Sequence, residues 1–359
     1  MTPRIYQLYI IKNYLKTVLL ITFVFFSAIF VLNIFEEISY FKESDKKIIF
    51  PIILTFLNTP SILYEIFPFI FLISTQFFFI RVFDKDELNV FKNFGITNYK
   101  IIKTITFTSL LLGIFIVTIF YNLSSKFKYI YFDLKSGQSK DNKYLAVITN
   151  NGIWIKDEFK EKINIINAKK LVKNKLMDVS ISQFDNNFNI IRYIYTNEAN
   201  IENNDWYLKK ATISKDNNKS VKNEFIFRTN FNSEKIKSLF SNLSSLTFFK
   251  LQKLKKEYEQ LGYSTSEING HFQKLYSYPV YLTIMCLFAS IIMLNIKHNN
   301  PITFNLVMGI LISVIIYYFN FFIFSLGENE YMPIELSVWL PLIIIFFFCC
   351  IGLVRINEK

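Results

Sequence analysis

The sequence predicts an α-helical integral membrane protein with six transmembrane helices and an inserted β-jelly-roll domain between the third and the fourth. Three observations lead to this fold class. Of the 359 residues, 52% are hydrophobic and 18% are aromatic, which is too apolar for an ordinary soluble domain. Six windows hold enough apolar residues to cross a bilayer core, which takes about 20 residues of helix. One long hydrophilic block separates the first three windows from the last three.

The predicted spans follow the apolar windows. They cover residues 18–35 (with a preceding turn from Ile11), 61–82, 101–121, 275–296, 302–326 and 334–354. The first window is longer than the apolar run of a signal peptide, and NIFEEISYFK after it lacks a small-x-small cleavage site, so we expect a retained span. The chain then divides into residues 1–123 with three spans, the inserted domain 124–272, and residues 273–359 with three more.

Basic residues near the span ends predict the orientation, because they favour the cytoplasmic side of a membrane. They occur at both termini and after the second window, where the loop holds Arg81, Lys85, Lys92, Lys100 and Lys103. The segment GENEYMPIE between the fifth and sixth windows has three glutamates and no lysine or arginine. We therefore expect a multi-pass inner-membrane protein with both termini in the cytoplasm and the inserted domain in the periplasm.

The inserted domain is predicted to be mostly β-structure. KYLAVITNNGIWIKDE alternates apolar and polar residues around the turn signal Asn150-Asn151-Gly152, which favours a hairpin. Further short strands are expected in INIINAKKL, DVSISQFDNNFNIIRYIYTNEANI and DWYLKKATI. Short strands at such spacing are typical of a sandwich or a jelly roll. The end of the block, SLTFFKLQKLKKEYEQLG, has a helical pattern instead.

Several kinds of chemistry are excluded. The chain has no G-x-x-x-x-G-K-[ST] phosphate loop, no G-x-S-x-G and no H-E-x-x-H, so we expect no catalytic residues of these classes. Its three cysteines, Cys286, Cys349 and Cys350, all fall in predicted spans, so neither a disulfide framework nor a metal site is expected. The net charge of +12 is mostly lysine without a nucleic-acid-binding motif, which favours a solvated basic surface and no nucleic-acid partner. Acidic residues are rare in the spans, with Glu65 the main exception, so any transport would draw its energy from a partner.

The segment FDKDELNVFKNFG after the second window predicts a short amphipathic helix over residues 84–95. Asp84 and Glu87 are spaced as a capping box, and Gly95 suits the position just after a helix. An apolar stripe at helical spacing lies between them, made of Leu88, Val90, Phe91 and Phe94. Two interpretations stay open: a helix that lies on lipid headgroups, or a coupling helix that docks in a groove of a cytoplasmic ATPase.

The same region carries a resemblance to a known family. TPSILYEIFPFIFLISTQFFFIRVFDKDELNVFKNFGIT resembles the second span and coupling helix of the LptF/LptG lipopolysaccharide-export permeases. The matching positions are Pro60, Pro68, Asp86, Glu87, Leu88 and Gly95. The resemblance continues in NNGIWIKDEFKEKINIINAKKL, in LGYSTSEINGHFQKLYSYPVYLTIMCLFASIIML and in MGILISVIIYYFNFFIFSLGENEYMPIELSVWLPLII, and so covers essentially the whole chain in order. GIWIKDE and DVSISQFDNNFNIIRYIYTNEA look more like LptG than LptF.

The resemblance implies a transmembrane permease subunit of an ATP-driven ABC transporter that extracts lipopolysaccharide from the inner membrane and passes it toward the outer membrane. Such a subunit is not an enzyme and binds no cofactor, because a separate partner ATPase uses the ATP and Mg. The implied partners are a homologous LptF-like permease, a cytoplasmic LptB-like ATPase dimer, an LptC/LptA-like periplasmic bridge protein, lipopolysaccharide and membrane lipid. The residues implied to contact the ATPase are Asp86, Glu87, Leu88, Phe91 and Gly95.

Candidate lipid contacts include one departure from the family pattern. Asn33 stands where the LptG pattern has a lysine, and Glu36 and Glu37 follow it. Carboxylates repel phosphates, so headgroup recognition would fall to the lysines Lys42, Lys46, Lys47 and Lys135, or the substrate would carry a different headgroup. The alternative is that both glutamates only face water. Tyr317 and Phe319 in IIYYFNFFIF suit acyl chains in an inner cavity, although they would equally suit bilayer lipid.

Two other functions remain as alternatives. A permease of another ABC system, for lipoprotein release or efflux, usually has four spans. A non-transporting sensor or scaffold with a periplasmic β-domain would co-purify with no ATPase.

Overall fold

The computed structural model describes residues 5–42, 49–136, 153–159, 162–172, 174–185, 188–215, 218–233, 236, 242–260, 264–295, 302–329 and 331–357. The chain forms two compact units. One unit comprises Met1–Ser125 together with Ser266–Lys359, and the other comprises Lys126–Thr265.

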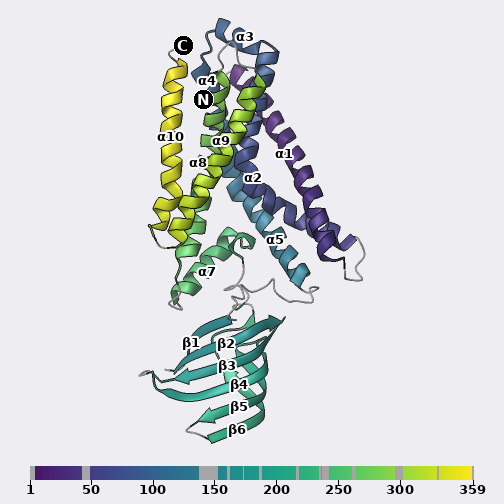
Figure 1. Cartoon of the computed structure of the whole chain (residues 1–359), viewed down its shortest axis with the longest axis vertical. Coiled ribbons are helices and arrows are strands. Elements are labelled where there is room, and N and C mark those ends of the chain that lie inside the picture. The colour runs from purple at the N-terminus through teal and green to yellow at the C-terminus, as the bar shows by residue number, and fades with distance from the viewer. Residues whose placement is uncertain are drawn as a thin grey trace. The chain divides into compact units, whose positions relative to one another are not determined.

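The first unit consists of helices (Figure 1). They are α1 (Ile5–Tyr40), α2 (Ile49–Asp84), α3 (Glu87–Asn93), α4 (Asn98–Phe115), the π-helical turn η1 (Ile116–Phe120), the start of α5 (Tyr121–Ser136), α8 (Ser266–Leu294), α9 (Ile302–Glu328) and α10 (Ile334–Asn357). Six helical stretches are long and apolar enough to cross a membrane, namely Ile5–Tyr40, Ile49–Asp84, Asn98–Lys135, Ser266–Leu294, Thr303–Glu328 and Ile334–Ile356. The six spans predicted from the sequence are therefore confirmed.

The spans differ in how much of their surface lies inside the bundle. Helix α8 packs against α2, α4, α9 and α10, while α1 packs against α2 and α4. The apolar windows of α2 and α8 are 61% and 56% buried, whereas those of α1 and α9 are only 22% and 17% buried. Helices α1 and α9 thus leave most of their apolar surface outside the core of the subunit.

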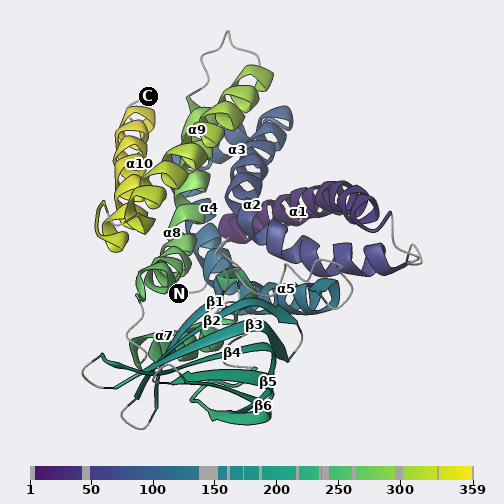
Figure 2. The same ribbon diagram turned by 60° about the horizontal axis from the view of Figure 1, so that its bottom comes forward.

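Helix α2 bends along its length, and its first half leans away from α9 and α10 together with the second half of α1 (Figures 1 and 2). Two prolines inside the helix, Pro60 and Pro68, account for the bend. A proline lacks the backbone N–H of the helical ladder and its ring clashes with the preceding turn, so the helix kinks there.

The third span is a continuous helix with one irregular turn. Helix α4 passes into η1, whose hydrogen bonds span five residues, and η1 passes into α5. Near the end of α4, Gly113 allows a close crossing with α8, because a Cβ atom at Gly113 would lie 2.8 Å from Cα of Pro279. Helices α4 and α8 therefore approach more closely than any larger residue at this position would permit.

The second unit contains a six-stranded antiparallel sheet. Its strands are β1 (Ile153–Phe159), β2 (Lys162–Val172), β3 (Lys175–Phe184), β4 (Ile190–Asn200), β5 (Asp205–Lys215) and β6 (Asn218–Arg228). The sheet has the order β1-β2-β3-β4-β5-β6, so each described strand pairs with its neighbour in sequence (Figure 2). The predicted β-domain between the third and fourth spans is confirmed, with the described strands in one sheet.

Most of the predicted strands are found. The three segments from INIINAKKL to DWYLKKATI form β2 to β5, and the helical pattern after them forms α7 (Phe248–Gln260). The expected turn at Asn150-Asn151-Gly152 and the strand before it lie outside the described residues. Strand β6 was not predicted, because most of its residues are polar or charged and exposed.

One face of the sheet carries its core. Trp206 is fully buried there, and its Nε1 donates a hydrogen bond to the backbone oxygen of Phe231 at 2.7 Å. The ring of Phe227 lies 6.1 Å from that of Trp206. The indole thus ties the sheet to the chain that follows β6.

Candidate functional sites

Helix α3 begins later than the sequence suggested. Helix α2 continues through Asp84, and the N-cap of α3 is Asp86. Asp86 has a left-handed backbone (φ 55°), and its Oδ1 accepts a hydrogen bond from Nδ2 of Asn89 at 2.6 Å. The predicted capping box of Asp84 and Glu87 is therefore wrong, because a residue inside the ladder of one helix does not have the backbone conformation needed to cap the next.

The end of α3 agrees with the prediction. The backbone N–H of Ile96 donates to the oxygen of Phe91 and that of Gly95 donates to the oxygen of Lys92, both at 2.9 Å. This is the Schellman pattern, and Gly95 has the left-handed backbone it requires (φ 71°). No atom lies within 4 Å of the place where a Cβ of Gly95 would stand, so the backbone angle rather than crowding favours glycine. The predicted stop at Gly95 is confirmed.

The first residue of α3 is bound to the first span. Oε1 of Glu87 accepts a hydrogen bond from the hydroxyl of Tyr9 at 2.7 Å. The ring of Tyr9 also meets the ring of Phe91 edge-on, with centroids 6.4 Å apart. A contact between positions 78 residues apart gave no signal in the sequence, so Tyr9 was missed there.

The apolar residues of α3 divide between the core and the surface. Phe91 is only 8% exposed and belongs to the core of the helical unit, and Leu88 packs against the same core. Val90 is 49% exposed and Phe94 is 80% exposed. The expectation that Phe91 enters a pocket of a partner does not fit this arrangement, because its side chain already fills the subunit's own core. The exposed side chains of α3 and of its C-cap are Asn89, Val90, Lys92, Asn93 and Phe94, while Glu87 is half-buried.

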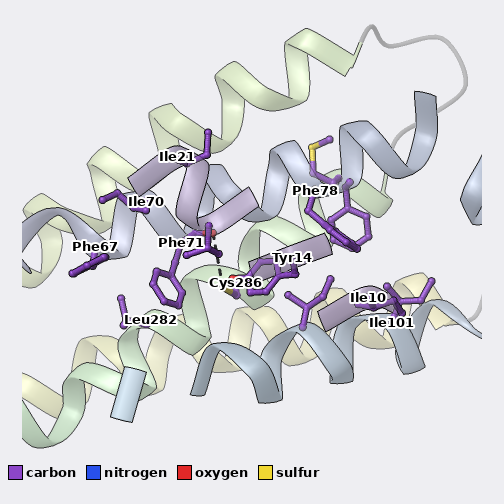
Figure 3. Close-up of a cluster of buried hydrophobic side chains, with 14 of the residues drawn as sticks. Ile10, Tyr14, Ile21, Phe67, Ile70, Phe71, Phe78, Ile101, Leu282 and Cys286 are labelled. Carbon is purple, nitrogen blue, oxygen red and sulfur yellow. Dashed lines mark hydrogen bonds between the residues drawn. The ribbon is translucent and has the colours of Figure 1, made fainter. Parts of the chain in front are cut away.

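A small polar cluster lies in the helical core, and Figure 3 shows two of its members, Tyr14 and Cys286, among apolar side chains. The hydroxyl of Tyr14 is 2.9 Å from Oγ of Ser109 and 2.9 Å from Sγ of Cys286. Oγ1 of Thr75 donates to the same sulfur at 3.3 Å. All four side chains are buried, and they come from α1, α2, α4 and α8. The cluster thus joins four helices where the rest of the contact is apolar.

The lipid-contact candidates of α1 lie on two of its faces. Asn33 is 7% exposed and Glu37 is 2% exposed, so both are buried, one helical turn apart. Glu36 and Lys42 are exposed. The alternative that both glutamates only face water is therefore wrong for Glu37.

The other lipid-contact candidates lie on α5 and α9. Lys135 in α5 is buried, and its Nζ donates to the hydroxyl of Tyr131 at 2.6 Å. Tyr317 and Phe319 in α9 are exposed, and the ring of Tyr317 lies 5.7 Å from that of Phe69 in α2. The candidates therefore come from three elements, while Lys46 and Lys47 lie outside the described residues.

One charged residue of a span was missed by the sequence reasoning. Lys274 lies in α8, with Nζ 3.1 Å from the centroid of the Phe324 ring in α9. The apolar window that defined the fourth span began one position later, so Lys274 was left just outside the predicted span. A cation over an aromatic face is attractive, and it orients the start of α8 toward α9.

The described part of the chain contains no group of three or more His, Cys, Asp or Glu side chains that could hold a metal ion.

The model of one protein family matches the chain. That family is described as lipopolysaccharide export system permease LptF/LptG, and the match covers residues 8–355. It does not separate the two kinds of subunit. No curated protein matches the chain.

Proposed function

The chain belongs to the LptF/LptG family and is a permease subunit of the lipopolysaccharide export system, and from this premise we propose that it works in an ATP-driven transporter that extracts lipopolysaccharide from the inner membrane. The observation that carries the proposal is the extent of the match, from residue 8 to residue 355. It reaches into all six candidate spans and includes the described sheet, so the resemblance is not confined to one domain. We further propose an LptG-like rather than an LptF-like subunit.

In this proposal α3 is the coupling helix. The chain itself has no phosphate loop, so ATP and Mg are used by a separate, LptB-like ATPase dimer on the cytoplasmic side. The carboxylate of Glu87, which also accepts the hydrogen bond from Tyr9, would pair with a basic residue of that ATPase, beside the exposed apolar side chains of Val90 and Phe94. Asp86 and Gly95 set the two ends of the helix, while Leu88 and Phe91 hold it to the subunit.

The second permease, LptF-like, would contact α1 and α9. These two helices are the least buried of the spans, and both expose large apolar side chains such as Phe23 and Ile315. Membrane lipid covers such surfaces as readily as a partner helix does, so the proposal rests on this exposure together with the family membership.

The lipid path is also proposed. Lys42 would meet headgroup phosphates beyond Asn33 and Glu36, Lys135 would be a separate phosphate contact, and Tyr317 and Phe319 would line the cavity for acyl chains. The β-domain would lie in the periplasm, with both termini in the cytoplasm, and would hand the lipid to an LptC/LptA-like bridge protein.

The test is reconstitution with the partner subunits in proteoliposomes that contain radiolabelled lipopolysaccharide. We expect ATP-dependent transfer of the label to the soluble bridge protein, and none with a non-hydrolysable nucleotide. Release of a lipoprotein instead would indicate another ABC system. Purification from membranes with no ATPase bound would indicate a sensor or scaffold.

A further inference from the structure

A row of polar side chains crosses the core face of the sheet. Asp157 on β1 stands opposite Asn164 on β2, Asn164 stands opposite Gln183 on β3, and Gln183 stands opposite Arg192 on β4. The first three are 0%, 1% and 5% exposed. Buried polar groups reduce stability unless they are hydrogen-bonded, so a row of them on an apolar face needs an explanation.

Hydrogen bonds connect the row from end to end. Nδ2 of Asn164 donates to Asp157 at 3.5 Å, Nε2 of Gln183 donates to Oδ1 of Asn164 at 2.7 Å, and Nε of Arg192 donates to Oε1 of Gln183 at 2.8 Å. Asp157 is held in turn by Asn230, whose Nδ2 donates to it at 2.9 Å. The row therefore fixes the position of one cation, the guanidinium of Arg192.

The guanidinium keeps its outer nitrogens free for another acceptor. Among the described residues, Arg192 makes one side-chain hydrogen bond, through Nε. Its central carbon lies 5.4 Å from the centroid of the Phe225 ring. Burial lowers the pKa of Arg192 below its ordinary value, yet an arginine stays charged at physiological pH.

The pairing of β4 with β5 ends next to Arg192, because β5 ends at Lys215. The pairing of β4 with β5 ends at Tyr193 and Ser214, although β4 begins three residues earlier, at Ile190. In the pairing of β3 with β4, Gln183 meets Arg192 and Phe184 meets Ile190, so Ile191 is a surplus residue that forms a bulge. Bulges end strand pairing and turn nearby side chains in a new direction, and they are frequent beside functional sites.

A pocket of about 270 Å³ opens where the pairing of β4 with β5 ends. It lies at one end of the sheet. The opposite end holds Ile153, the first residue of β1, and Arg228, the last residue of β6. Its described lining includes three cationic residues, Arg192, Lys215 and Lys219, and no carboxylate. The volume is below the range of about 300–1,000 Å³ that is usual for larger organic ligands, which suits a small anionic group.

We propose that this pocket binds a phosphate group carried on a sugar. Arginine presents a planar fork that matches two phosphate oxygens, Lys215 adds a point charge on the same face of the sheet, and Lys219 adds one from the other face. For the source of the phosphate the proposal rests on the proposed function, in which the headgroup of the exported glycolipid is a phosphorylated disaccharide. Inorganic phosphate has the same chemistry and is the competing source.

Calorimetric titration of the purified full chain in detergent tests the site without any transport. The probes are a bisphosphorylated glucosamine disaccharide, the same disaccharide without phosphates, and inorganic phosphate. We expect only the phosphorylated disaccharide to bind measurably. Equal binding of the unphosphorylated sugar, or no binding of the phosphorylated one, would overturn the proposal, and equal binding of inorganic phosphate would overturn the assignment to a headgroup.

Matched variants locate the binding. Lys215→Gln and Lys219→Gln change exposed residues and are expected to keep the fold, and each should weaken binding about tenfold, the effect of one charge-assisted hydrogen bond. Lys209→Gln removes the same charge from β5 away from the pocket and should bind normally, because Glu198 keeps its contact with Lys175. Weakening by Lys209→Gln equal to that by Lys215→Gln would show a general charge effect and contradict the pocket.

The positioning role of the polar row has its own test. Gln183→Leu leaves every charge in place but removes the acceptor that holds Arg192, so binding should weaken severalfold while far-ultraviolet circular dichroism stays unchanged. Unchanged binding would show that the row is only structural.

ATP-dependent lipid release by the wild type is measured in parallel. If the wild type releases no lipopolysaccharide, the proposed function is contradicted. If it does release lipopolysaccharide but Lys215→Gln has no effect on disaccharide binding, only the proposed pocket is contradicted.

Discussion

Tyr9 donates a hydrogen bond of 2.7 Å to Glu87, so the first span is joined to α3 through the carboxylate that is proposed to meet the ATPase. The ring contact between Tyr9 and Phe91 strengthens the same junction. A carboxylate oxygen accepts more than one hydrogen bond, so a partner's cation and Tyr9 compete for Glu87 or share it. We therefore expect a movement of α3 on docking to be transmitted directly to α1.

Substitutions of Glu87 should separate docking from folding. Removing one partner of a buried charge pair costs about 2 to 5 kcal/mol, so Glu87→Lys should lose the ATPase in a pull-down, and Glu87→Gln should retain less of it than the wild type. Tyr9→Phe is the control, because it removes the internal hydrogen bond and leaves the charge, and it should retain the ATPase at least as well as the wild type. Wild-type retention by Glu87→Lys, at normal membrane levels, would mean that α3 is only a surface helix.

The orientation can be checked with added cysteines. Lys210 in β5 and Asn93 in α3 are both exposed. We expect a membrane-impermeant thiol reagent to label Lys210→Cys in cells with a permeabilised outer membrane, and to label Asn93→Cys only after the inner membrane is opened. The native chain supplies the background from its three cysteines. The reverse pattern would refute a periplasmic β-domain.

The polar cluster around Tyr14 should contribute measurably to stability in detergent. Hydrogen bonds between membrane helices contribute about 0.6 kcal/mol on average and up to about 1.7 kcal/mol. Because the Tyr14 hydroxyl meets both Ser109 and Cys286, we expect Tyr14→Phe to lie at the upper end of this range and to lower the thermal midpoint. Tyr317→Phe, which changes an exposed tyrosine of α9, is the matched control and should leave the midpoint unchanged.

Acid should weaken the sheet through Glu198. Nζ of Lys175 lies 2.5 Å from its carboxylate, and the hydrogen bond from Lys175, with a second from Lys209, lowers the pKa of Glu198 below its ordinary value of 4.5. A lowered pKa means that the stabilisation is complete above pH 4.5 and is lost as the pH falls through the folded-state value.

A fragment of residues 124–272 allows the measurement. It should give a β-rich circular-dichroism spectrum. On acidification its free energy of unfolding should fall by less than about 1 kcal/mol per exposed ion pair. Glu198→Gln should reduce this acid dependence and leave stability unchanged at a pH below the folded-state pKa of Glu198. An acid dependence identical to that of the wild type would contradict the assignment.

The sequence predicted those features that depend on one segment at a time. The length of apolar runs was enough for the six spans, and alternation was enough for β2 to β5. Gly95 was predictable because its backbone angle belongs to one short motif. The residues that the sequence did not place correctly depend on neighbours far along the chain. Phe91 looks the same on a helical wheel whether its apolar surroundings are its own core or a partner.

Register explains the other omissions. Strand β6 has mostly polar residues, so only its pairing with β5 makes it a strand. The row from Asp157 to Arg192 exists because four residues on four strands stand opposite one another, and an alternation pattern does not give that alignment. The capping-box prediction was wrong for a related reason, because the polar residues at the end of α2 give no sequence signal for where that helix ends.

The π turn in the third span determines which way α5 faces relative to α4. An α-helix turns by about 100° per residue, and a π turn accommodates one additional residue without breaking the helix. Straightening of the turn at Ile116–Phe120 into a regular α-helix, with no residue lost, would rotate everything after it by about 100° relative to α4. Tyr121, Ser124 and Ser125, which are now buried, would then turn out of the core, although no side chain had been replaced.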